Sequence, residues 1–431
     1  MLLACPYCSR SPPDCPPWPG PNRKRSLPHG DHPRARLLLV LALATAVGLF
    51  IALIPGHRGW FDVGVYHGTV NDWVHAGGDI YGYTRLDTHY GFTYPPFAAV
   101  VMLPMSLLGW HPAIVVHLAL TALAGAAILY WLVDPIAQEH TWPRLFTVGV
   151  AACLLGALQP VRDTVSFGQV NLLLLALVLL DGWLLTTGRD RWAGIGIGLA
   201  AAIKLTPAIF IVYLLLSGRR RAAALATGTA IAATLLAVLI APGPSWTFWT
   251  EVLGDTHRIG DLAYVSNQSL RGVIARLPEA VPRTGPWLVL VAATLALWAV
   301  RVRRAARAGD VWGGFALTGL AACLISPVTW VHHLVWALPA LILLYAAGLR
   351  EHVPDRRRRL LLAAAGAHIV LCSSVVWLWS RHHTGPDGLL GGSMYVWITL
   401  ALLAFLPLRT PTPDVHRPAA PESITVRAAR S

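Results

Sequence analysis

The sequence predicts an all-α protein that crosses a membrane many times. Of the 431 residues, 55% are hydrophobic and only 13% are charged, whereas a soluble domain carries about 25% charged residues. Apolar runs of about 17–25 residues recur along the chain, and each could cross a bilayer as a helix. Lys and Arg cluster between these runs, as in the cytosolic loops of membrane proteins. The net charge of +13 therefore indicates membrane topology rather than nucleic-acid binding.

The apolar runs predict about twelve transmembrane helices in one domain, residues 37–409. Ten runs lie at residues 37–54, 112–132, 145–159, 170–187, 222–241, 287–300, 311–327, 334–349, 360–379 and 393–409, and two short helices are expected within 193–216. The run 96–109 contains Pro104 and Gly109, which favours an interfacial helix or a partial span. Residues 1–36 and 410–431 are expected to be disordered cytosolic tails.

The first tail contains a Cys-x-x-Cys pair, Cys5 and Cys8, with Cys15 nearby. A structural zinc site needs about four ligands, and no second pair follows. The other three cysteines lie in apolar runs and are expected to be small core residues. We therefore expect no metal site from the cysteines.

The segment 193–216 is long enough for one span, but basic loops, 189–191 and 219–221, flank both its ends. A single crossing would place one of these loops outside, whereas two short helices keep both in the cytosol. Pro207 disfavours helical geometry in the preceding residue and lacks a backbone donor. The sequence therefore predicts a break at Lys204-Leu205-Thr206-Pro207.

With the N-terminus in the cytosol, the basic residues concentrate on the cytosolic side and both termini are cytosolic. The long outer segments are then residues 55–95 and 242–286. Four polar features that are far apart in sequence fall at this outer face: Asp62, Lys204, Asn267 and His332.

Asp62 lies in GWFDVGVYHG, just after the first span, among apolar neighbours. An acid past a helix end can simply be solvated. Partial burial would instead raise its pKa and make it a better base. Asp72, Asp79 and Asp87 lie in the same segment and compete for that role.

Two further motifs could contribute to a site at the outer face. In TYPPF, residues 93–97, two prolines fix the backbone direction, and Tyr94 could line a pocket or lie in the interfacial aromatic belt. In QPVRDTVSFGQVN, Arg162 could pair with Asp163 in a short outer loop, or it could face a phosphate. Gln169 and Asn171 begin the next helix, and their amides could bond backbone or a sugar hydroxyl.

Lys204 has no acid nearby in the sequence. A charge at membrane depth is costly and usually faces a cavity or a partner, and broken helices recur at binding sites. A lipid phosphate would be a natural counter-ion, although Lys204 could instead extend to the outer interface. In NQSLRG, Asn267, Gln268 and Arg271 could bind an anionic head group, and Asn267-Gln268-Ser269 also matches the N-glycosylation pattern.

The segment SPVTWVHHLVW contains Trp330 and the adjacent His332 and His333. Neighbouring residues on an α-helix point about 100° apart, so these histidines are poorly placed to share a metal. We expect one of them to face a site and the other to pack. No HExxH or paired-carboxylate motif is present, so no metal is predicted.

An Asp followed by Val-Tyr-type residues after the first span, then YPPF, GQVN, KLTP, NQS and SPVTW-x-HH in that order, resembles glycosyltransferase family 87. No single motif is specific, but the ordered set is. The resemblance covers roughly residues 37–409 and implies a GT-C type integral-membrane mannosyltransferase that uses polyprenyl-phosphate mannose.

The resemblance also implies an inverting transfer that forms an α-linked, often α-1,2-linked, mannoside on a glycolipid or lipoglycan acceptor. Asp62 would be the general base, without any metal or cofactor, and His332 and His333 would belong to the catalytic site. Phosphate contacts are expected from Lys204, Arg162, Arg271, Asn267 and Gln268, and substrate contacts from Tyr66, Tyr94, Gln169, Asn171 and Trp330. The enzyme would lie in the plasma membrane among lipids, with its site on the extracytoplasmic face.

Two alternatives share parts of this pattern. An arabinosyltransferase that uses a polyprenyl-phosphate arabinose donor would have the same architecture. A lipid or sugar transporter could also have a broken helix and a buried lysine. Transporters, however, usually contain internal repeats and midplane charges, whereas here no repeat is evident and the polar motifs gather at one face.

Overall fold

The computed structural model describes residues 33–54, 56–85, 88–255, 258–278, 280–381 and 385–409. The two predicted tails lie outside these ranges, apart from residues 33–36, which begin the first helix. Cys5, Cys8, Cys15 and Asp87 likewise lie outside the described residues.

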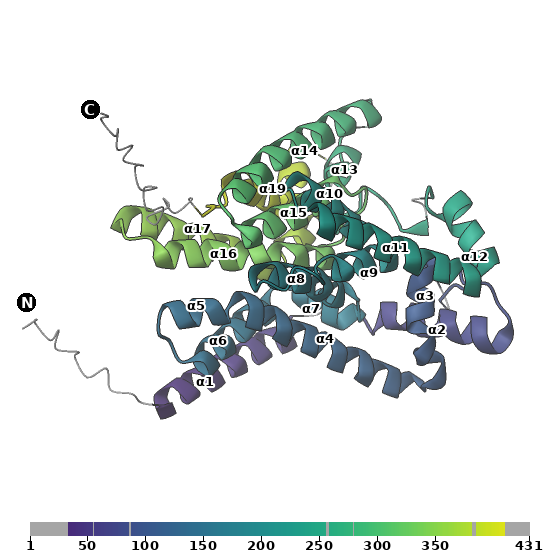
Figure 1. The fold of residues 1–431 in the computed structure, drawn as a ribbon, viewed down its shortest axis with the longest axis horizontal. Coiled ribbons are helices and arrows are strands. Elements are labelled where there is room, and N and C mark those ends of the chain that lie inside the picture. The colour runs from purple at the N-terminus through teal and green to yellow at the C-terminus, as the bar shows by residue number, and fades with distance from the viewer. Residues whose placement is uncertain are drawn as a thin grey trace, which may run out of the picture.

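Helices form nearly all the regular structure of the described chain, which confirms the predicted fold class (Figure 1). The extended contacts there are two isolated bridges, Thr84 with Gly91 and Asn267 with Trp330. The longer helices overlap the predicted apolar runs: α1 (Pro33–Leu53), α4 (Trp110–Leu132), α6 (Arg144–Ala157), α8 (Asn171–Thr186), α11 (Arg220–Ile240), α14 (Thr284–Arg307), α15 (Val311–Ile325), α16 (Leu338–Arg350), α17 (Pro354–Ser373) and α19 (Met394–Phe405).

Shorter helices connect and cap these elements. They are α2 (Phe61–Asn71), η2 (Asp72–Ala76), α3 (Pro96–Met102), η3 (Leu103–Leu107), α5 (Asp134–Glu139), α7 (Gln159–Phe167), α9 (Ile195–Ile203), η4 (Thr206–Ala208), α10 (Ile209–Leu216), α12 (Pro242–Thr247), η5 (Phe248–Val252), α13 (Leu270–Ala275), η7 (Val331–Ala337), η8 (Val375–Trp379) and α18 (Pro386–Gly391). Two of them replace predicted loops: α2 lies in the first outer segment, and α7 lies where a short outer loop was expected.

By length and composition, five helices of the described chain could each cross a membrane: α1, α4 with α5, α11, α14, and η7 with α16. The pair α6 and α7, bent by 76°, could make a sixth. Several other predicted spans correspond to apolar helices of 10–17 residues, such as α8, α15 and α19. The structure thus supports a polytopic membrane protein, without confirming the predicted count of twelve spans.

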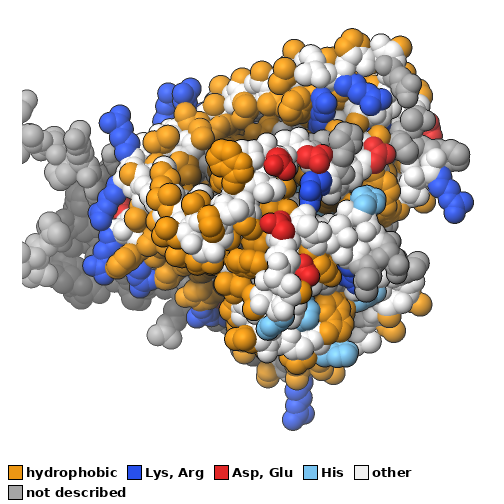
Figure 2. Space-filling model, turned by 90° about the vertical axis from the view of Figure 1, so that its right-hand side faces the viewer, with side chains coloured by type: hydrophobic (Ala, Val, Ile, Leu, Met, Phe, Trp, Pro, Cys, Tyr) orange, Lys and Arg blue, Asp and Glu red, His pale blue; other side chains and the backbone are white. Residues whose placement is uncertain are grey.

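Apolar surface surrounds the bundle. α1 has no buried residue, and Leu37, Leu38 and Leu39 are each more than half exposed. Such exposure is expected where lipid replaces water as the solvent. Figure 2, viewed toward the end that carries α2 and α12, shows acidic side chains gathered near the centre of an otherwise largely apolar face, with basic and histidine side chains beside them.

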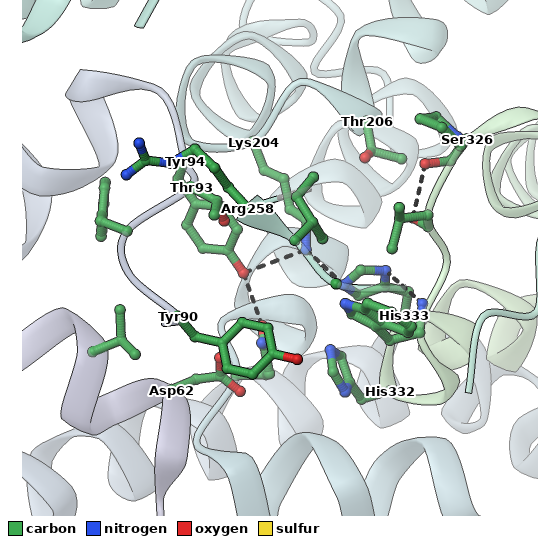
Figure 3. Close-up of a pocket in the computed structure, with 18 of the residues that line it drawn as sticks. Asp62, Tyr90, Thr93, Tyr94, Lys204, Thr206, Arg258, Ser326, His332 and His333 are labelled. Atoms are coloured by element: carbon green, nitrogen blue, oxygen red, sulfur yellow. Dashed lines mark hydrogen bonds between the residues drawn. The ribbon is translucent and has the colours of Figure 1, made fainter. Parts of the chain in front are cut away.

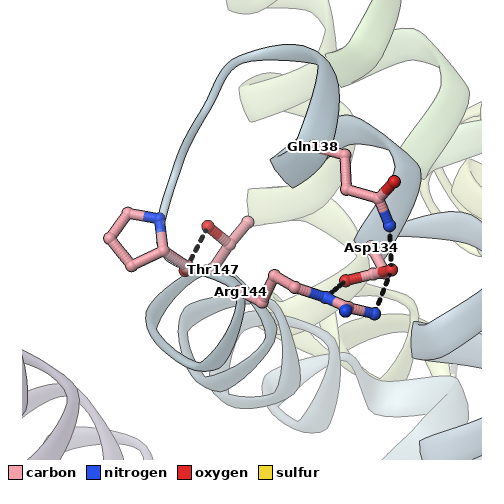
Figure 4. Close-up of polar contacts among 5 residues, drawn as sticks. Asp134, Gln138, Arg144 and Thr147 are labelled. Carbon is pink, nitrogen blue, oxygen red and sulfur yellow. Dashed lines mark hydrogen bonds and ion pairs between the residues drawn. The ribbon is translucent and has the colours of Figure 1, made fainter.

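A polar clamp holds the turn between α4 and α6 (Figure 4). Asp134, at the start of α5, is buried and accepts hydrogen bonds from Gln138 and from the guanidinium of Arg144. Arg144 is the first residue of α6, so this ion pair ties the two helices together at the end of the bundle away from α2.

The predicted helix break at Lys204 is present. α9 ends at Ile203, Lys204 is extended with φ −147° and ψ 129°, and η4 begins two residues later with Pro207 in its first turn. Small residues bring α9 against α11, because a Cβ on Gly198 would overlap the Ala226 carbonyl. This close packing fixes the end of α9 and therefore the position of Lys204.

Candidate active site

A cavity of about 880 Å³ lies where α2, the segment 90–95, the start of η4 and η7 meet (Figure 3). Much of its wall is apolar or aromatic, and a few polar groups converge in it. These polar groups include Arg58, Asp62, Tyr66, Tyr94, Gln169, Lys204, His332 and His333.

Asp62 lies in the first turn of α2. Gly59 and Trp60 before it both have left-handed backbone conformations, with φ of 59° and 53°, and so turn the chain sharply into the helix. The Trp60 N–H donates to the Ser166 carbonyl at 3.1 Å, which joins this turn to α7. Arg85 donates to the carbonyls of Trp60 and Phe61 and holds the same turn from the other side.

A hydrogen-bonded group of two tyrosines and an amide surrounds Asp62. The hydroxyls of Tyr66 and Tyr94 lie 3.1 Å apart, and each donates to Oε1 of Gln169, at 3.2 and 2.9 Å. Since that oxygen accepts both hydroxyls, the Gln169 amide N–H remains for the Asp62 carboxylate. The network thus fixes the orientation of the carboxylate in the cavity.

Burial raises the pKa of Asp62 to about 7. The hydrogen bond from Gln169 and the charges of Lys204 and Arg85 oppose this shift without cancelling it. A carboxylate with a pKa near the working pH is a more effective proton acceptor than an ordinary one.

Lys204 reaches the same cavity from the helix break. Its Nζ lies 3.4 Å from the Tyr94 hydroxyl, 3.1 Å from Oδ1 of Asn171 and 3.0 Å from Nε2 of His333. It also lies 4.9 Å from the centre of the Tyr94 ring. None of these contacts is with a carboxylate, so the charge can accommodate an anionic ligand.

Both histidines line the cavity, although only one was expected to face it. Their rings meet edge to face, with centroids 4.6 Å apart. The backbone N–H of Trp330 donates to Nδ1 of His333 at 3.1 Å, which fixes that ring. The pair lies in the short 3₁₀-helix η7, which forms part of the cavity wall.

Comparisons with known proteins identify the family of this chain. The sequence model of glycosyltransferase family 87 matches residues 92–327. The chain belongs to glycosyltransferase family 87. This confirms the resemblance inferred from the ordered motifs. No solved structure matches the chain significantly.

Curated relatives of this family 87 member come from mycobacteria. A polyprenol-phosphate-mannose-dependent alpha-(1-2)-phosphatidylinositol mannoside mannosyltransferase of Mycobacterium tuberculosis is 32% identical over 398 residues, covering 85% of this chain and 89% of the relative. A pentamannoside mannosyltransferase of the same species is also 32% identical and covers 77% of each chain. A mannoside mannosyltransferase of Mycolicibacterium smegmatis is 31% identical, covering 82% of this chain and 86% of the relative. These names do not favour the arabinose or transporter alternatives.

Asn171 and Trp330 were both predicted to contact substrate. Of the two, Trp330 lines the cavity of this family 87 chain. Asn171 lies just behind the wall, where it donates to the His332 carbonyl at 3.3 Å and accepts from Lys204. Asn171 is thus placed to orient Lys204 and η7.

Asn267 and Gln268 form a polar brace under the cavity. Asn267 is fully buried, donates to the carbonyls of Leu262 and Pro327, and accepts from the Thr329 N–H at 3.0 Å. Gln268 donates to the carbonyls of Val265 and Gly392, each at 2.6 Å. Their amides hold the segment that leads to η7.

Arg162 and Arg271, two of the predicted phosphate contacts, do not line this cavity. Arg162 donates to the Ala157 and Cys372 carbonyls and to the Ser374 hydroxyl, at 2.8–3.1 Å. It therefore ties α7 to the end of α17. Arg271 lies over the Trp287 ring at 4.9 Å and donates to a backbone carbonyl.

The competing acids Asp72 and Asp79 also do not line the cavity. Asp79 accepts from the Tyr81 N–H at 2.8 Å, which stabilises a turn. Asp72 begins η2, and its carbonyl accepts from the Gly78 N–H at 3.1 Å. Of the four acids in the first outer segment, Asp62 alone among those described reaches the cavity.

Sequence analysis did not identify several cavity residues, among them Arg58, Tyr90, Arg258, Tyr264 and Trp377. Arg58 stands four residues before Asp62, a spacing that could have drawn attention to it. The others come from segments without a distinctive pattern. Arg258, for example, lies within the second predicted outer segment and donates to the Tyr81 carbonyl.

Proposed function

We propose that the chain transfers a mannosyl residue from a polyprenyl-phosphate mannose donor to a phosphatidylinositol mannoside, forming an α-1,2 linkage. The names of the curated relatives support this choice of donor, acceptor and linkage. The structural observation that carries it is the convergence of Asp62 and Lys204 on one cavity, on either side of Tyr94 (Figure 3).

Asp62 acts as the general base. As the acceptor hydroxyl attacks C1 of the mannosyl group, its proton passes to the carboxylate. The C1–O bond to the phosphate breaks with its electron pair, so polyprenyl phosphate leaves and the configuration at C1 inverts. The partial burial of Asp62 and its raised pKa suit this role.

Lys204 stabilises the phosphate that leaves. Charge-assisted hydrogen bonds to phosphate are among the strongest in proteins, and a donor held in place beforehand favours the state in which negative charge develops. Oδ1 of Asn171 accepts a hydrogen bond from Nζ and so holds it in position, and the His333 ring lies beside it.

Aromatic side chains form the surfaces on which sugars can pack. Tyr264 and Trp330 both line the cavity, with ring centroids 6.2 Å apart. Their flat faces suit the apolar side of a pyranose. The cavity volume is large enough for more than one sugar ring together with a phosphate.

We place the cavity on the extracytoplasmic side and both termini in the cytosol. Basic residues support this orientation because they gather at the other end of the bundle. Arg350 pairs there with Glu139 at 2.6 Å, and Arg301, near the end of α14, donates to the Ala404 carbonyl near the end of α19. α1 begins and α19 ends at that side as well (Figure 1).

The test is a transfer assay with purified protein in lipid, radiolabelled polyprenyl-phosphate mannose and phosphatidylinositol mannosides, in the presence of EDTA. We expect the wild type to form a labelled glycolipid from which a linkage-specific α-mannosidase releases the label. Asp62→Asn should form none. Full activity in a folded Asp62→Asn protein would overturn the role of Asp62. Donor binding without transfer to any phosphatidylinositol mannoside would overturn the proposed acceptor.

A further inference from the structure

Arg58 lies in the short link between α1 and α2, and its guanidinium lines the cavity. Two aromatic rings flank it: its central carbon lies 5.6 Å from the centre of Phe167 and 5.1 Å from that of Trp377. Among the described residues it has no ion pair, and its buried Nε has no hydrogen-bond partner. An arginine that is held by aromatic rings and open to a cavity is well placed to bind an anion.

The acid on the adjacent helix α7 does not supply that anion. Asp163 is buried and accepts a hydrogen bond from Nε2 of Gln159 at 3.1 Å. Gln159 in turn accepts from the Tyr395 hydroxyl at 2.6 Å, so this chain of contacts leads away from the cavity. Asp163 therefore feels the charge of Arg58 across space, but it forms no ion pair with the guanidinium among the described residues, and the donors of Arg58 remain open to a ligand.

His332 provides a second unpaired group on the same wall. Its side chain is 6% exposed, and its Nε2 is buried without a hydrogen-bond partner. Its ring packs on Phe167 at 5.1 Å, the same ring that flanks Arg58. The His332 carbonyl accepts from Thr164 and Asn171, at 3.1 and 3.3 Å, which holds this residue in place.

We propose that Arg58 and His332 form a phosphate subsite, separate from Lys204, that binds the phosphodiester of one of the two lipid substrates. The proposal rests on the proposed function. A guanidinium fork and an imidazole N–H match phosphate oxygens in charge and in donor geometry. Lys204 contacts His333, whereas Arg58 and His332 share the Phe167 ring, so the two cationic groups adjoin different members of the histidine pair.

Two phosphate subsites match the chemistry of the reaction. The donor carries a phosphodiester between its prenyl chain and the sugar, and a phosphatidyl acceptor carries another in its head group. Two phosphodiesters bound in the cavity at the same time would each be stabilised by a cation of their own. The experiment below therefore distinguishes the donor from the acceptor as the ligand of Arg58.

The main variant is Arg58→Gln, with Arg58→Lys as the conservative version. Arg189→Gln is the matched control, because Arg189 also lies over an aromatic ring, Trp183 at 4.7 Å, but outside the cavity. KM and kcat are measured separately for polyprenyl-phosphate mannose and for phosphatidylinositol mannoside. Binding of polyprenyl monophosphate and of phosphatidylinositol to the protein in detergent is measured without any transfer.

Loss of a charge-assisted contact worth about 1.5–3 kcal/mol corresponds to a tenfold or larger loss of affinity. We expect Arg58→Gln to raise KM for one lipid, and Kd for the matching phosphate lipid, by about tenfold or more, with kcat changed less than threefold. Arg58→Lys should recover part of the affinity, and Arg189→Gln should match the wild type. A rise for the donor pair assigns the subsite to the donor, and a rise for the acceptor pair assigns it to the acceptor.

The proposal is overturned if both lipids bind Arg58→Gln as they bind the wild type, or if only kcat falls. Should Arg58→Gln fail to fold, Arg58→Lys decides instead: wild-type affinity for both lipids in that variant would overturn a requirement for the guanidinium. The binding measurements separate this proposal from the proposed function. If the wild type transfers no mannose, the proposed function is refuted. If Arg58→Gln nevertheless binds the phosphate lipids more weakly than the wild type does, the subsite is supported.

Discussion

The Tyr94 hydroxyl lies 3.4 Å from Nζ of Lys204 and donates at 2.9 Å to Gln169. It is therefore the link between the cation of the cavity and the amide that orients Asp62. Such buried polar networks hold their members in one geometry as long as every member is satisfied. The positions of the base and of the cation are thus coupled through one phenol.

Replacing Tyr94 with Phe should lower kcat/KM for transfer by about tenfold or more, since it removes the hydroxyl from Gln169 and from Lys204 at once. The ring remains, so the fold should be retained. Tyr345→Phe is the control, because Tyr345 lies on α16 and does not line the cavity. Equal kcat/KM values for Tyr94→Phe and the wild type would contradict a role for this link.

The transfer rate should depend on pH through Asp62. Its pKa is raised to about 7, so below that pH the carboxyl is increasingly protonated and cannot accept a proton. We expect kcat/KM to fall about tenfold for each pH unit below 7 and to approach its maximum near pH 8. Initial rates between pH 5 and pH 9 at fixed ionic strength check this. A flat profile across pH 6 to 8 would argue against Asp62 as the base.

Asp62 should also make the protein less stable as the pH rises. Because its folded-state pKa is above the ordinary value of 3.8, the folded protein holds a proton that the unfolded chain has already released. That contribution to stability is complete at low pH and is lost as the pH rises through about 7. In detergent, the melting temperature of Asp62→Asn minus that of the wild type should therefore increase between pH 4 and pH 7. Above about pH 7 this difference should stay constant. A difference independent of pH would show that Asp62 titrates normally.

Much of the fold could be predicted because lipid imposes long apolar runs, and the helices overlap those runs. The helix break at Lys204 was predicted from Pro207 and the flanking charges, and it is present. The span count was not confirmed, since helices inside the bundle can be shorter than a bilayer is thick. α7 was missed because QPVRDTVSF is polar, and polarity alone resembles a loop.

The sequence could not predict which arginine side chains face the cavity. Sequence analysis named Arg162, which stands in a motif, and did not single out Arg58. The 76° bend between α6 and α7 and the pairing of α7 with the end of α17 instead bring Arg162 to backbone carbonyls. Arg58 faces the cavity because two consecutive left-handed residues, Gly59 and Trp60, turn the chain just after it. Bends of this kind depend on tertiary packing that a linear pattern does not contain.

Gly64 lies in α2, one helical turn after Trp60, where the helix contacts Arg85. A Cβ on Gly64 would overlap the guanidinium of Arg85. Arg85 would then have to leave the carbonyls of Trp60 and Phe61, which it holds next to Asp62. Gly64→Ala should therefore lower kcat by tenfold or more through a misplaced base, because a small displacement of a catalytic group is costly.

The control for Gly64→Ala is Gly125→Ala in α4, where a Cβ would meet nothing within 4 Å. Ala is favoured over Gly by about 1 kcal/mol inside a helix, so this control should be neutral or slightly more stable with unchanged transfer. Both proteins are compared by melting temperature and by kcat. If Gly64→Ala melts like the control and keeps full kcat, Arg85 does not position Asp62. If its kcat falls while its melting temperature holds, the loss comes from the geometry of the α2 turn rather than from unfolding.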